Sequence, residues 1–410
     1  MPTVSFTTSG ALRKSALRQA NERLVLDSIR RTPGISRAEI ARTTGFSRTS
    51  VTFVVNRLLK SRLILEEKIE NGLQAGRPPT ALQLNAQSML AIGVEIARPR
   101  SGVVLVDLNG KVIDRRTIPW DKDVDAFFDE IRMAIRDVTV SFKPSRILGV
   151  GVSLPGTIDK SVGRVVGAEG LDWFNIDVGT RLRHKFKWPF FFENDANLSA
   201  LAEQWLSSNA ESLRYFVYVR TQGGVGTGVV VDGRILHGVA SAGAEFGHVM
   251  LYPDGRSCQC GNRGCWEQYA SDAALTREYR ELSGESIDDC LLIVKRAREK
   301  DAIALLALRK TASFLALGFV NLVVALNPQA IIMGEPYASA WDLVDDVVLG
   351  ELDRRVPAYS LRNLRLLPSR TGADSALRGA AALVLAHFFT RFDHTKDDSL
   401  PIGVSIEAHA

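Results

Sequence analysis

The sequence predicts an α/β protein with an N-terminal winged helix-turn-helix domain and a larger body of two α/β lobes. Residues 1–85 have the pattern of three short helices followed by a hairpin. The rest of the chain contains two successive sets of strands and helices in the same order. A third observation adds a local feature, because three of the four cysteines, Cys258, Cys260 and Cys265, lie close together. A length of 410 residues is enough for two or three domains with well-buried cores.

The overall composition is that of an ordinary globular protein, with 46% hydrophobic and 24% charged residues. The N-terminus lacks the charged-then-apolar layout of a signal peptide, and four cysteines do not make a disulfide framework in a chain of this size. The most apolar stretch, Ala312 to Leu326, is interrupted by Ser313 and Asn321, so it is too short to span a bilayer and indicates a buried core helix. We therefore expect a cytoplasmic protein with no membrane partner.

Charge is distributed unevenly along the chain. Residues 1–85 contain fourteen Lys and Arg against six Asp and Glu, a net charge of +8. Because the whole chain carries +5, residues 86–410 carry −3. A basic head on a mildly acidic body indicates that the head alone meets a polyanion such as DNA. Charge by itself leaves open the alternative of a solvated basic surface.

Three helices are predicted between Ser15 and Arg62. Ser36 and Glu39 form a capping box that begins the second helix, and Gly45 suits the left-handed turn that ends it. Ser47 caps the third helix, and apolar residues spaced three and four apart give that helix one buried stripe. The stripe consists of Val51, Val54, Val55, Leu58 and Leu59.

The polar start of the third helix matches the recognition helix of a helix-turn-helix domain. A hairpin wing is predicted over 63–85, with Arg77 at or near its tip. We expect the head to bind DNA, although the same topology also occurs in small bundles that dock proteins. The expected DNA-binding residues are Arg48, Thr49, Ser50, Thr52 and Arg77.

After residue 85 the pattern changes to α/β. Strands are predicted at 90–97, at 102–118 as a hairpin turning at Asn109-Gly110, and at 147–153, with a helix around 123–141. A second set of strands and helices begins near Tyr215 and includes a strand at 330–334. This repeat predicts two lobes with a cleft between them. The expected divisions are 86–195 for the first lobe, 196–390 for the second, and a disordered tail over 391–410.

The clustered cysteines have the composition of a metal site. Cys258, Cys260 and Cys265, with His248 just upstream, supply the three thiolates and one imidazole of a tetrahedral zinc shell. A closed shell of four protein ligands leaves no position for water, so we expect one structural Zn²⁺ per chain. The alternative is a set of buried or redox-active thiols. Cys290 stands apart and is expected in the core.

The cysteine segment resembles the zinc signature of the ROK family, which contains sugar kinases and transcriptional repressors. The resemblance covers about residues 86 to 390, and the head is similar to that of the family's repressor branch. It implies a two-lobed, actin-like and sugar-kinase-like body with a structural zinc loop. The segments that carry it are 149–159, 193–203, 228–238 and 243–271.

The resemblance also implies a sugar site. The family's sugar kinases surround a hexose with side chains at positions that this sequence fills with the same residue types. Carboxylates and amides accept and donate hydrogen bonds to a ring of hydroxyls. Glu169 stands where kinases often place Asn and is a further, weaker candidate. The implied sugar-binding residues are Asn194, Asp195, Glu245, His248 and Glu267.

Two departures from the kinase pattern argue against catalysis. The kinases carry an Asp-x-Gly-Gly-Thr loop after the first strand, whereas this chain has Glu95 and then residues 97–99, including Pro99, which lacks a backbone N–H. Residues 222–224 alter a second phosphate-binding segment. We therefore expect no catalytic residue, with Asp195 acting as a hydroxyl ligand rather than as a base.

Together these features predict a sugar-responsive transcription regulator, expected to be a repressor. Its partners would be operator DNA and a sugar or sugar phosphate effector. A homodimer or homotetramer is expected, because one recognition helix reads too few base pairs. The alternative is a sugar kinase with a fused DNA-binding domain.

Overall fold

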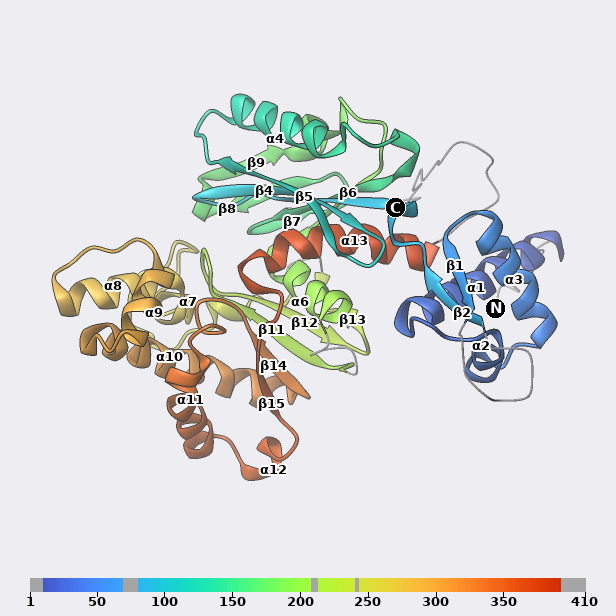
Figure 1. Cartoon of the computed structure of the whole chain (residues 1–410). Helices are drawn as coiled ribbons and strands as arrows, with labels where there is room; N and C mark the ends of the chain where they lie inside the picture. The colour runs from blue at the N-terminus through green and yellow to red at the C-terminus, as the bar shows by residue number, and fades with distance from the viewer. Residues whose placement is uncertain (1–9, 69–79, 208–212, 240–242, 392–410) are drawn as a thin grey trace, which may run out of the picture.

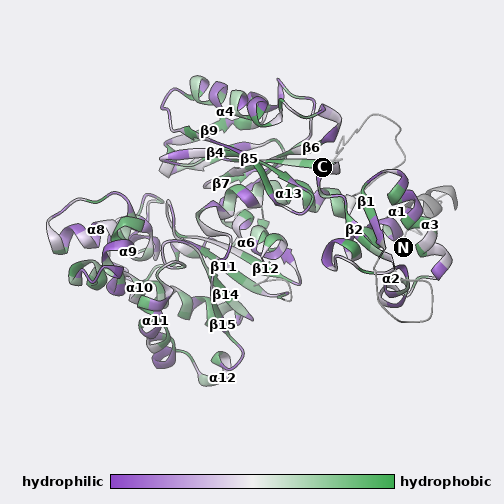
Figure 2. Cartoon of the chain, in the orientation of Figure 1, coloured by the Kyte–Doolittle hydropathy of each residue, from purple (hydrophilic) through white to green (hydrophobic). Residues whose placement is uncertain are grey.

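The computed structural model describes residues 10–68, 80–207, 213–239 and 243–391. The N-terminal head lies at the right of Figure 1, the first lobe at the top and the second lobe at the lower left. Hydrophobic residues concentrate in the strands of both lobes, and hydrophilic residues colour the outer faces of the peripheral helices (Figure 2). The tail predicted to be disordered falls, beyond residue 391, outside the described residues.

The head has the predicted winged helix-turn-helix order. Ser36 and Glu39 form the expected capping box, Gly45 adopts the left-handed conformation at φ 73°, and the Ser47 side chain accepts a hydrogen bond from the backbone N–H of Ser50. The wing strands pair antiparallel, and Ile35 adds a bridge to Leu82. The elements are α1 (Gly10–Arg31), α2 (Arg37–Thr44), α3 (Arg48–Lys60), β1 (Ile64–Lys68) and β2 (Thr80–Leu84).

The first lobe is built on a five-stranded sheet in the order β10-β6-β3-β4-β5, with β3, β6 and β10 parallel. The predicted hairpin turns at Asn109-Gly110, where Gly110 has φ 74°. One face of the sheet packs against α4, and a small sheet of β7, β8 and β9 lies beside it. The elements are β3 (Leu90–Glu95), β4 (Arg100–Asp107), β5 (Val112–Pro119), α4 (Val124–Thr139), β6 (Ile147–Leu154), β7 (Thr157–Asp159), β8 (Arg164–Ala168), β9 (Trp173–Asp177), α5 (Val178–Arg183) and β10 (Phe190–Asn194).

The second lobe repeats this topology. Its sheet has the order β13-β12-β11-β14-β15, again with a parallel half and an antiparallel half, so the predicted duplication is confirmed. Helices α7 to α10 lie between β13 and β14 in the chain. The elements are β11 (Phe216–Arg220), β12 (Gly226–Val231), β13 (Arg234–Ile235), α7 (Glu267–Ala270), α8 (Asp272–Ser283), α9 (Cys290–Arg298), α10 (Ala302–Leu326), β14 (Ala330–Met333), α11 (Trp341–Arg355), α12 (Ala358–Leu361) and β15 (Arg365–Pro368).

Helix α10 is a core helix, as predicted, because its buried residues form the centre of the second lobe's hydrophobic cluster. The argument from length was wrong, however. The helix begins at Ala302 and runs for 25 residues, and among the described residues it alone is long and apolar enough to cross a membrane. Its packing against α8, α9 and α11 accounts for its apolar composition.

Two helices cross between the lobes. Helix α6 (Asp195–Leu206) follows the last strand of the first sheet and packs on β11 and β12 of the second sheet. Helix α13 (Ser375–Arg391) follows the last strand of the second sheet and packs on β3 and β6 of the first, although the division at residue 196 would group it with the second lobe. The two helices pack on each other between the lobes (Figure 1). Gly151 in β6 permits α13 to approach the first sheet closely, because a Cβ there would lie 1.9 Å from the carbonyl oxygen of Ala380.

The head is not isolated from the body. Its buried residues share one hydrophobic cluster with β4 and with α13, including Leu385 and Phe389. The guanidinium of Arg30 in α1 lies 4.2 Å from the ring centre of Trp205 near the end of α6, and 5.5 Å from that of Phe389. Side chains of α1, α6 and α13 therefore meet at one junction.

Candidate functional site

The predicted DNA-reading residues lie where α3 begins. Arg48, Thr49, Ser50 and Thr52 are all exposed, on the sides of the helix away from the buried stripe. The hydroxyl of Thr52 donates to the carbonyl of Arg48 at 2.8 Å. This arrangement leaves the start of α3 accessible to a groove of DNA. Arg77, expected at the wing tip, lies outside the described residues.

The three cysteines and His248 come together in space. Sγ of Cys260 lies 3.7 Å from Sγ of Cys265, and Sγ of Cys258 lies 3.7 Å from Nδ1 of His248. All four ligand atoms lie within 4.8 Å of one another. A tetrahedral zinc ion with bonds of about 2.3 Å to sulfur sets sulfur–sulfur distances of roughly 3.8 Å. The group could therefore hold a metal ion.

The loop that carries the thiols doubles back through two glycines. Gly261 has φ 90° and Gly264 has φ 72°, and a Cβ at Gly264 would lie 1.6 Å from the carbonyl oxygen of Tyr252. Burial and the neighbouring thiols raise the pKa of Cys265 to about 12, so a cation is needed to hold the thiolate form at neutral pH. Cys290 lies apart, in the core of the second lobe, as predicted.

Glu267 joins the cysteine loop to the loop after β11. Its Oε2 accepts a hydrogen bond from the backbone N–H of Val225 at 3.0 Å, and Sγ of Cys258 lies 3.8 Å from its Oε1. A Cβ at Gly224 would lie 2.5 Å from Oε2, so the glycine makes room for this carboxylate. The position of Glu267 therefore depends on the same loop as the metal ligands.

Asn194 and Asp195 stand at the start of α6. The side chain of Asn194 caps the helix by accepting from the backbone N–H groups of Ala196 and Asn197, and its amide donates to the carbonyl of Gly156. Oδ1 of Asp195 accepts from the N–H of Ala196 at 2.8 Å. The N-terminus of a helix favours this negative charge.

Arg220, at the end of β11, is a functional candidate that sequence reasoning missed. Its Nε lies 3.1 Å from Oδ2 of Asp195, and its Nη2 lies 3.4 Å from Oε1 of Glu95 at the end of β3. Burial raises the pKa of Glu95 to about 7, against the opposing effect of Arg220. One buried guanidinium of the second lobe therefore contacts two carboxylates of the first lobe. No local motif predicts this contact, because Glu95, Asp195 and Arg220 are far apart in the chain.

Glu245 is exposed but belongs to the same electrostatic neighbourhood. Partial desolvation raises its pKa, His248 opposes the change, and the carboxylates of Asp195, Glu267 and Glu169 add to it. The structure thus brings the five sugar-site residues expected from the resemblance, and Glu169, into one region. All but Asn194 and His248 carry carboxylates, so the region is acidic.

One backbone N–H group in each of the two altered loops already has a side-chain partner. The N–H of Ala97 donates to Oγ of Ser101 at 3.1 Å, and the N–H of Gly223 donates to Asp272 at 3.0 Å. Arg98 is bonded to Asp172 at 3.1 Å and stacks on Trp120. Each loop therefore has at least one N–H group fewer to offer a phosphate, and Pro99 offers none.

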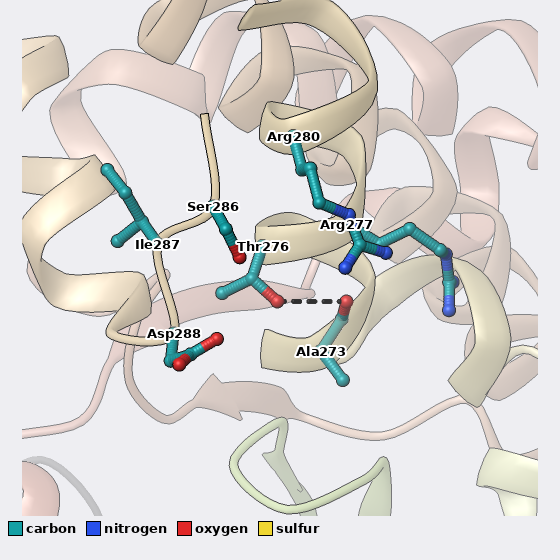
Figure 3. Close-up of a pocket in the computed structure, with 7 residues that line it drawn as sticks. All are labelled: Ala273, Thr276, Arg277, Arg280, Ser286, Ile287 and Asp288. Carbon is teal, nitrogen blue, oxygen red and sulfur yellow. Dashed lines mark hydrogen bonds between the residues drawn. The ribbon is translucent and has the colours of Figure 1, made fainter. Parts of the chain in front are cut away.

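A small cavity of about 140 Å³ lies beside α8, at the loop that follows this helix (Figure 3). Thr276 and Ser286 line it, and the Arg277 side chain points away from Ser286 and Asp288, with its guanidinium donating to the carbonyl of Gln268. None of the predicted site residues lines this cavity, which therefore adds nothing to the acidic region.

Comparison with known proteins connects these features. Residues 91–387 match the ROK family, and residues 18–64 match a winged helix-turn-helix DNA-binding domain. The chain is 30% identical over 381 residues to a xylose repressor of Bacillus spizizenii, covering 91% of this chain and 96% of that protein.

Solved structures show the same relationships. A ROK family transcriptional regulator, a homologue of the E. coli MLC protein, superposes with a TM-score of 0.76 at 24% identity, covering 91% of this chain and 97% of that one. A ROK family glucokinase from Streptomyces griseus, solved with glucose and AMPPNP, superposes with a TM-score of 0.66 at 25% identity, covering 72% and 98%. The kinase thus matches a smaller share of this chain than the regulators do. By its sequence and its fold, the chain belongs to the ROK family.

Proposed function

We propose that the protein is a sugar-responsive, DNA-binding transcriptional repressor. The observation that carries this proposal is the junction of α1, α6 and α13, which joins a recognition-helix domain to a body with an acidic region. The xylose repressor matched over nearly its full length supports the same function. As a DNA-binding regulator it would act in the cytoplasm, as a homodimer or homotetramer on a palindromic operator.

The effector would bind at the acidic region beside the cysteine loop. Asp195, Glu245 and Glu267 would accept hydrogen bonds from its hydroxyls, and Asn194 would hold the start of α6 in place. His248 would bind one structural Zn²⁺ together with the three cysteines, through Nδ1. Its other ring nitrogen would remain available to a hydroxyl. The metal would supply folding energy to the loop rather than take part in a reaction.

We propose that the chain binds its sugar without phosphorylating it. A general base needs an accessible carboxylate that takes the hydroxyl proton. Asp195, at the position of the kinases' base, instead has Oδ2 paired at 3.1 Å with Nε of the buried Arg220, so this oxygen is already occupied. The occupied N–H groups of Ala97 and Gly223 further disfavour binding of ATP phosphates.

A route from effector to head follows from the placement of α6. Its first residue, Asp195, lies in the acidic region, and Trp205, near its other end, contacts Arg30 of the head. A 12-residue α-helix is a rigid rod about 18 Å long, so a shift at one end moves the other. Sugar binding would thereby change the position of the recognition helix relative to the body.

Operator selection and effector screening test the proposal. A random duplex pool would be enriched on the full-length protein, and binding of the enriched duplex measured with xylose, glucose, N-acetylglucosamine and their phosphates. We expect one enriched site, weakened binding with one sugar, and a steep dependence on salt. Arg48→Ala should abolish or relax the site preference.

A parallel assay distinguishes the kinase alternative. The same sugars would be incubated with the protein, ATP and magnesium, and sugar phosphate would be measured. Its formation by wild type but not by Asp195→Asn would contradict the non-enzymatic proposal while leaving DNA binding intact.

A further inference from the structure

The recognition helix α3 exposes an aromatic side chain in the middle of its outer face. Phe53 is 57% exposed, although its neighbours on that face, Thr49 and Asn56, are polar. Residues three and four apart share one side of a helix, so these three side chains form one surface opposite the buried stripe. Phe53 is not part of the hydrophobic core of the head, so packing of the core does not require a large apolar side chain at this position.

Phe53 lies beside charged side chains of α1 and α3. The guanidinium of Arg57 lies 6.0 Å from its ring centre and is bonded at 3.1 Å to Glu22, a buried carboxylate of α1. The ring also lines a groove of about 390 Å³ between α1 and α3, with Arg18 and Thr49 on its walls. The ring therefore lies on a helix face at the edge of this groove, rather than on a loop.

The charge of this surface indicates its occupant. The head carries a net charge of +8, and the groove that the exposed ring lines also contains Arg18. A second copy of the same face would bring like charges together, whereas DNA phosphates neutralise them. In the major groove the apolar feature on a base edge is the 5-methyl group of thymine, which contacts apolar side chains such as Phe.

We propose that Phe53 reads a thymine in each operator half-site through its 5-methyl group. This inference rests on the proposed DNA-binding function and adds a specificity-determining residue to it. Arg48 and Thr49 would then read hydrogen-bonding groups near the start of α3, and Phe53 would read an apolar group one turn further along. The head would thus prefer T over C at one position without any hydrogen bond there.

Deoxyuridine provides the decisive test, because it removes the methyl group and keeps every Watson–Crick hydrogen bond. In the duplex enriched from a random pool, each thymine would be replaced singly by deoxyuridine, and the affinity of the full-length protein measured. We expect one thymine per half-site at which the replacement weakens binding about fourfold, as for one methylene left unburied. At the other thymines that face α3, the change should be much smaller.

A double-mutant cycle assigns the effect to the residue. Phe53→Ala should weaken binding to the thymine duplex and bind the thymine and deoxyuridine duplexes equally. Phe53→Leu should keep part of the preference. Phe174→Ala, which removes a similarly exposed ring (62%) from β9 of the body, is the matched control and should leave DNA binding unchanged.

The outcomes separate the inference from the function on which it rests. A wild-type protein that enriches no duplex overturns the proposed function and this inference together. A protein that enriches an operator but tolerates deoxyuridine at every thymine overturns the inference alone. The same holds if Phe53→Ala retains the full preference for thymine.

Discussion

The two lobes share one strand order but end their first strands with opposite charges. Strand β3 of the first lobe ends at Glu95, and strand β11 of the second ends at Arg220. These equivalent positions face each other, and the two side chains form a buried ion pair between the lobes. In a kinase with this fold the loops after these strands meet a phosphate chain. Here the duplicated strand ends bind each other.

The lobes also differ in where the chain inserts additional structure. The first lobe places β7, β8 and β9 between its last two parallel strands, β6 and β10. The second lobe places the cysteine loop and helices α7 to α10 before β14. Among the described residues, only the second lobe therefore contains a candidate metal site, and this site lies next to the acidic region. The two lobes therefore share one frame and differ in the residues at their strand ends and in their insertions.

Removing a thiol from the second lobe's insertion should have the largest effect. Wild type should contain one zinc per chain by elemental analysis, and Cys260→Ala should contain none. Because structural zinc contributes about 10 kcal/mol or more to small sites, the variant should also melt at a lower temperature. Cys290→Ala, which changes a core thiol of the same lobe, should retain the metal. A metal-free wild type with normal sugar response would contradict the site.

Carboxylates of the acidic region should rank second. Glu267→Ala should weaken the sugar response about ten- to a hundredfold, because loss of a charged acceptor costs about 1.5–3 kcal/mol. Asp195→Asn keeps the shape and one acceptor, so its loss should be smaller. Asp232→Asn changes an exposed carboxylate in the β12–β13 turn and serves as the control. Titration calorimetry with the effector found by screening would measure the sugar affinity of wild type and of each variant. A wild-type affinity in Glu267→Ala would exclude it from the site.

Burial of the Glu95 carboxyl between the lobes should make stability depend on pH. Burial raises the pKa of Glu95 to about 7 in the folded chain, above its ordinary value of 4.5. The folded state therefore holds this proton more tightly, so the stabilisation is present below pH 4.5 and is lost as pH rises through 7. The loss is at most on the order of 3 kcal/mol.

Glu95→Gln isolates this contribution, because the amide imitates the protonated carboxyl. The decline in melting temperature between pH 5 and pH 8 should become smaller than in wild type. Asp172→Asn, which alters a carboxylate paired with Arg98 at the surface, should leave the decline as it is. Equal pH dependence in wild type and Glu95→Gln would show that protonation of Glu95 does not cause the decline.

Local pattern was enough to predict the head, the lobe duplication and the cysteine cluster. Capping residues such as Ser36, the stripe on α3 and the spacing of Cys258 and Cys260 all act over a few positions of the chain. The bridge at Arg220 could not be predicted in this way, because a strand residue gains its partners only when two lobes pack. The return of α13 to the first sheet escaped prediction for the same reason.

The crossing helices yield the smallest expected effect and the most direct test of how the lobes influence the head. Trp205→Leu removes the ring beneath Arg30, and cation–π contacts contribute about 0.5–2 kcal/mol, so we expect a few-fold change. Operator binding without sugar should change little, since α3 is untouched, whereas the sugar-induced loss of binding should shrink. Trp188→Leu, a stacked tryptophan of the first lobe away from the head, is the control. If both variants respond to sugar as wild type does, α6 does not carry the signal, and α13, which contacts the head from the other sheet, becomes the element to test.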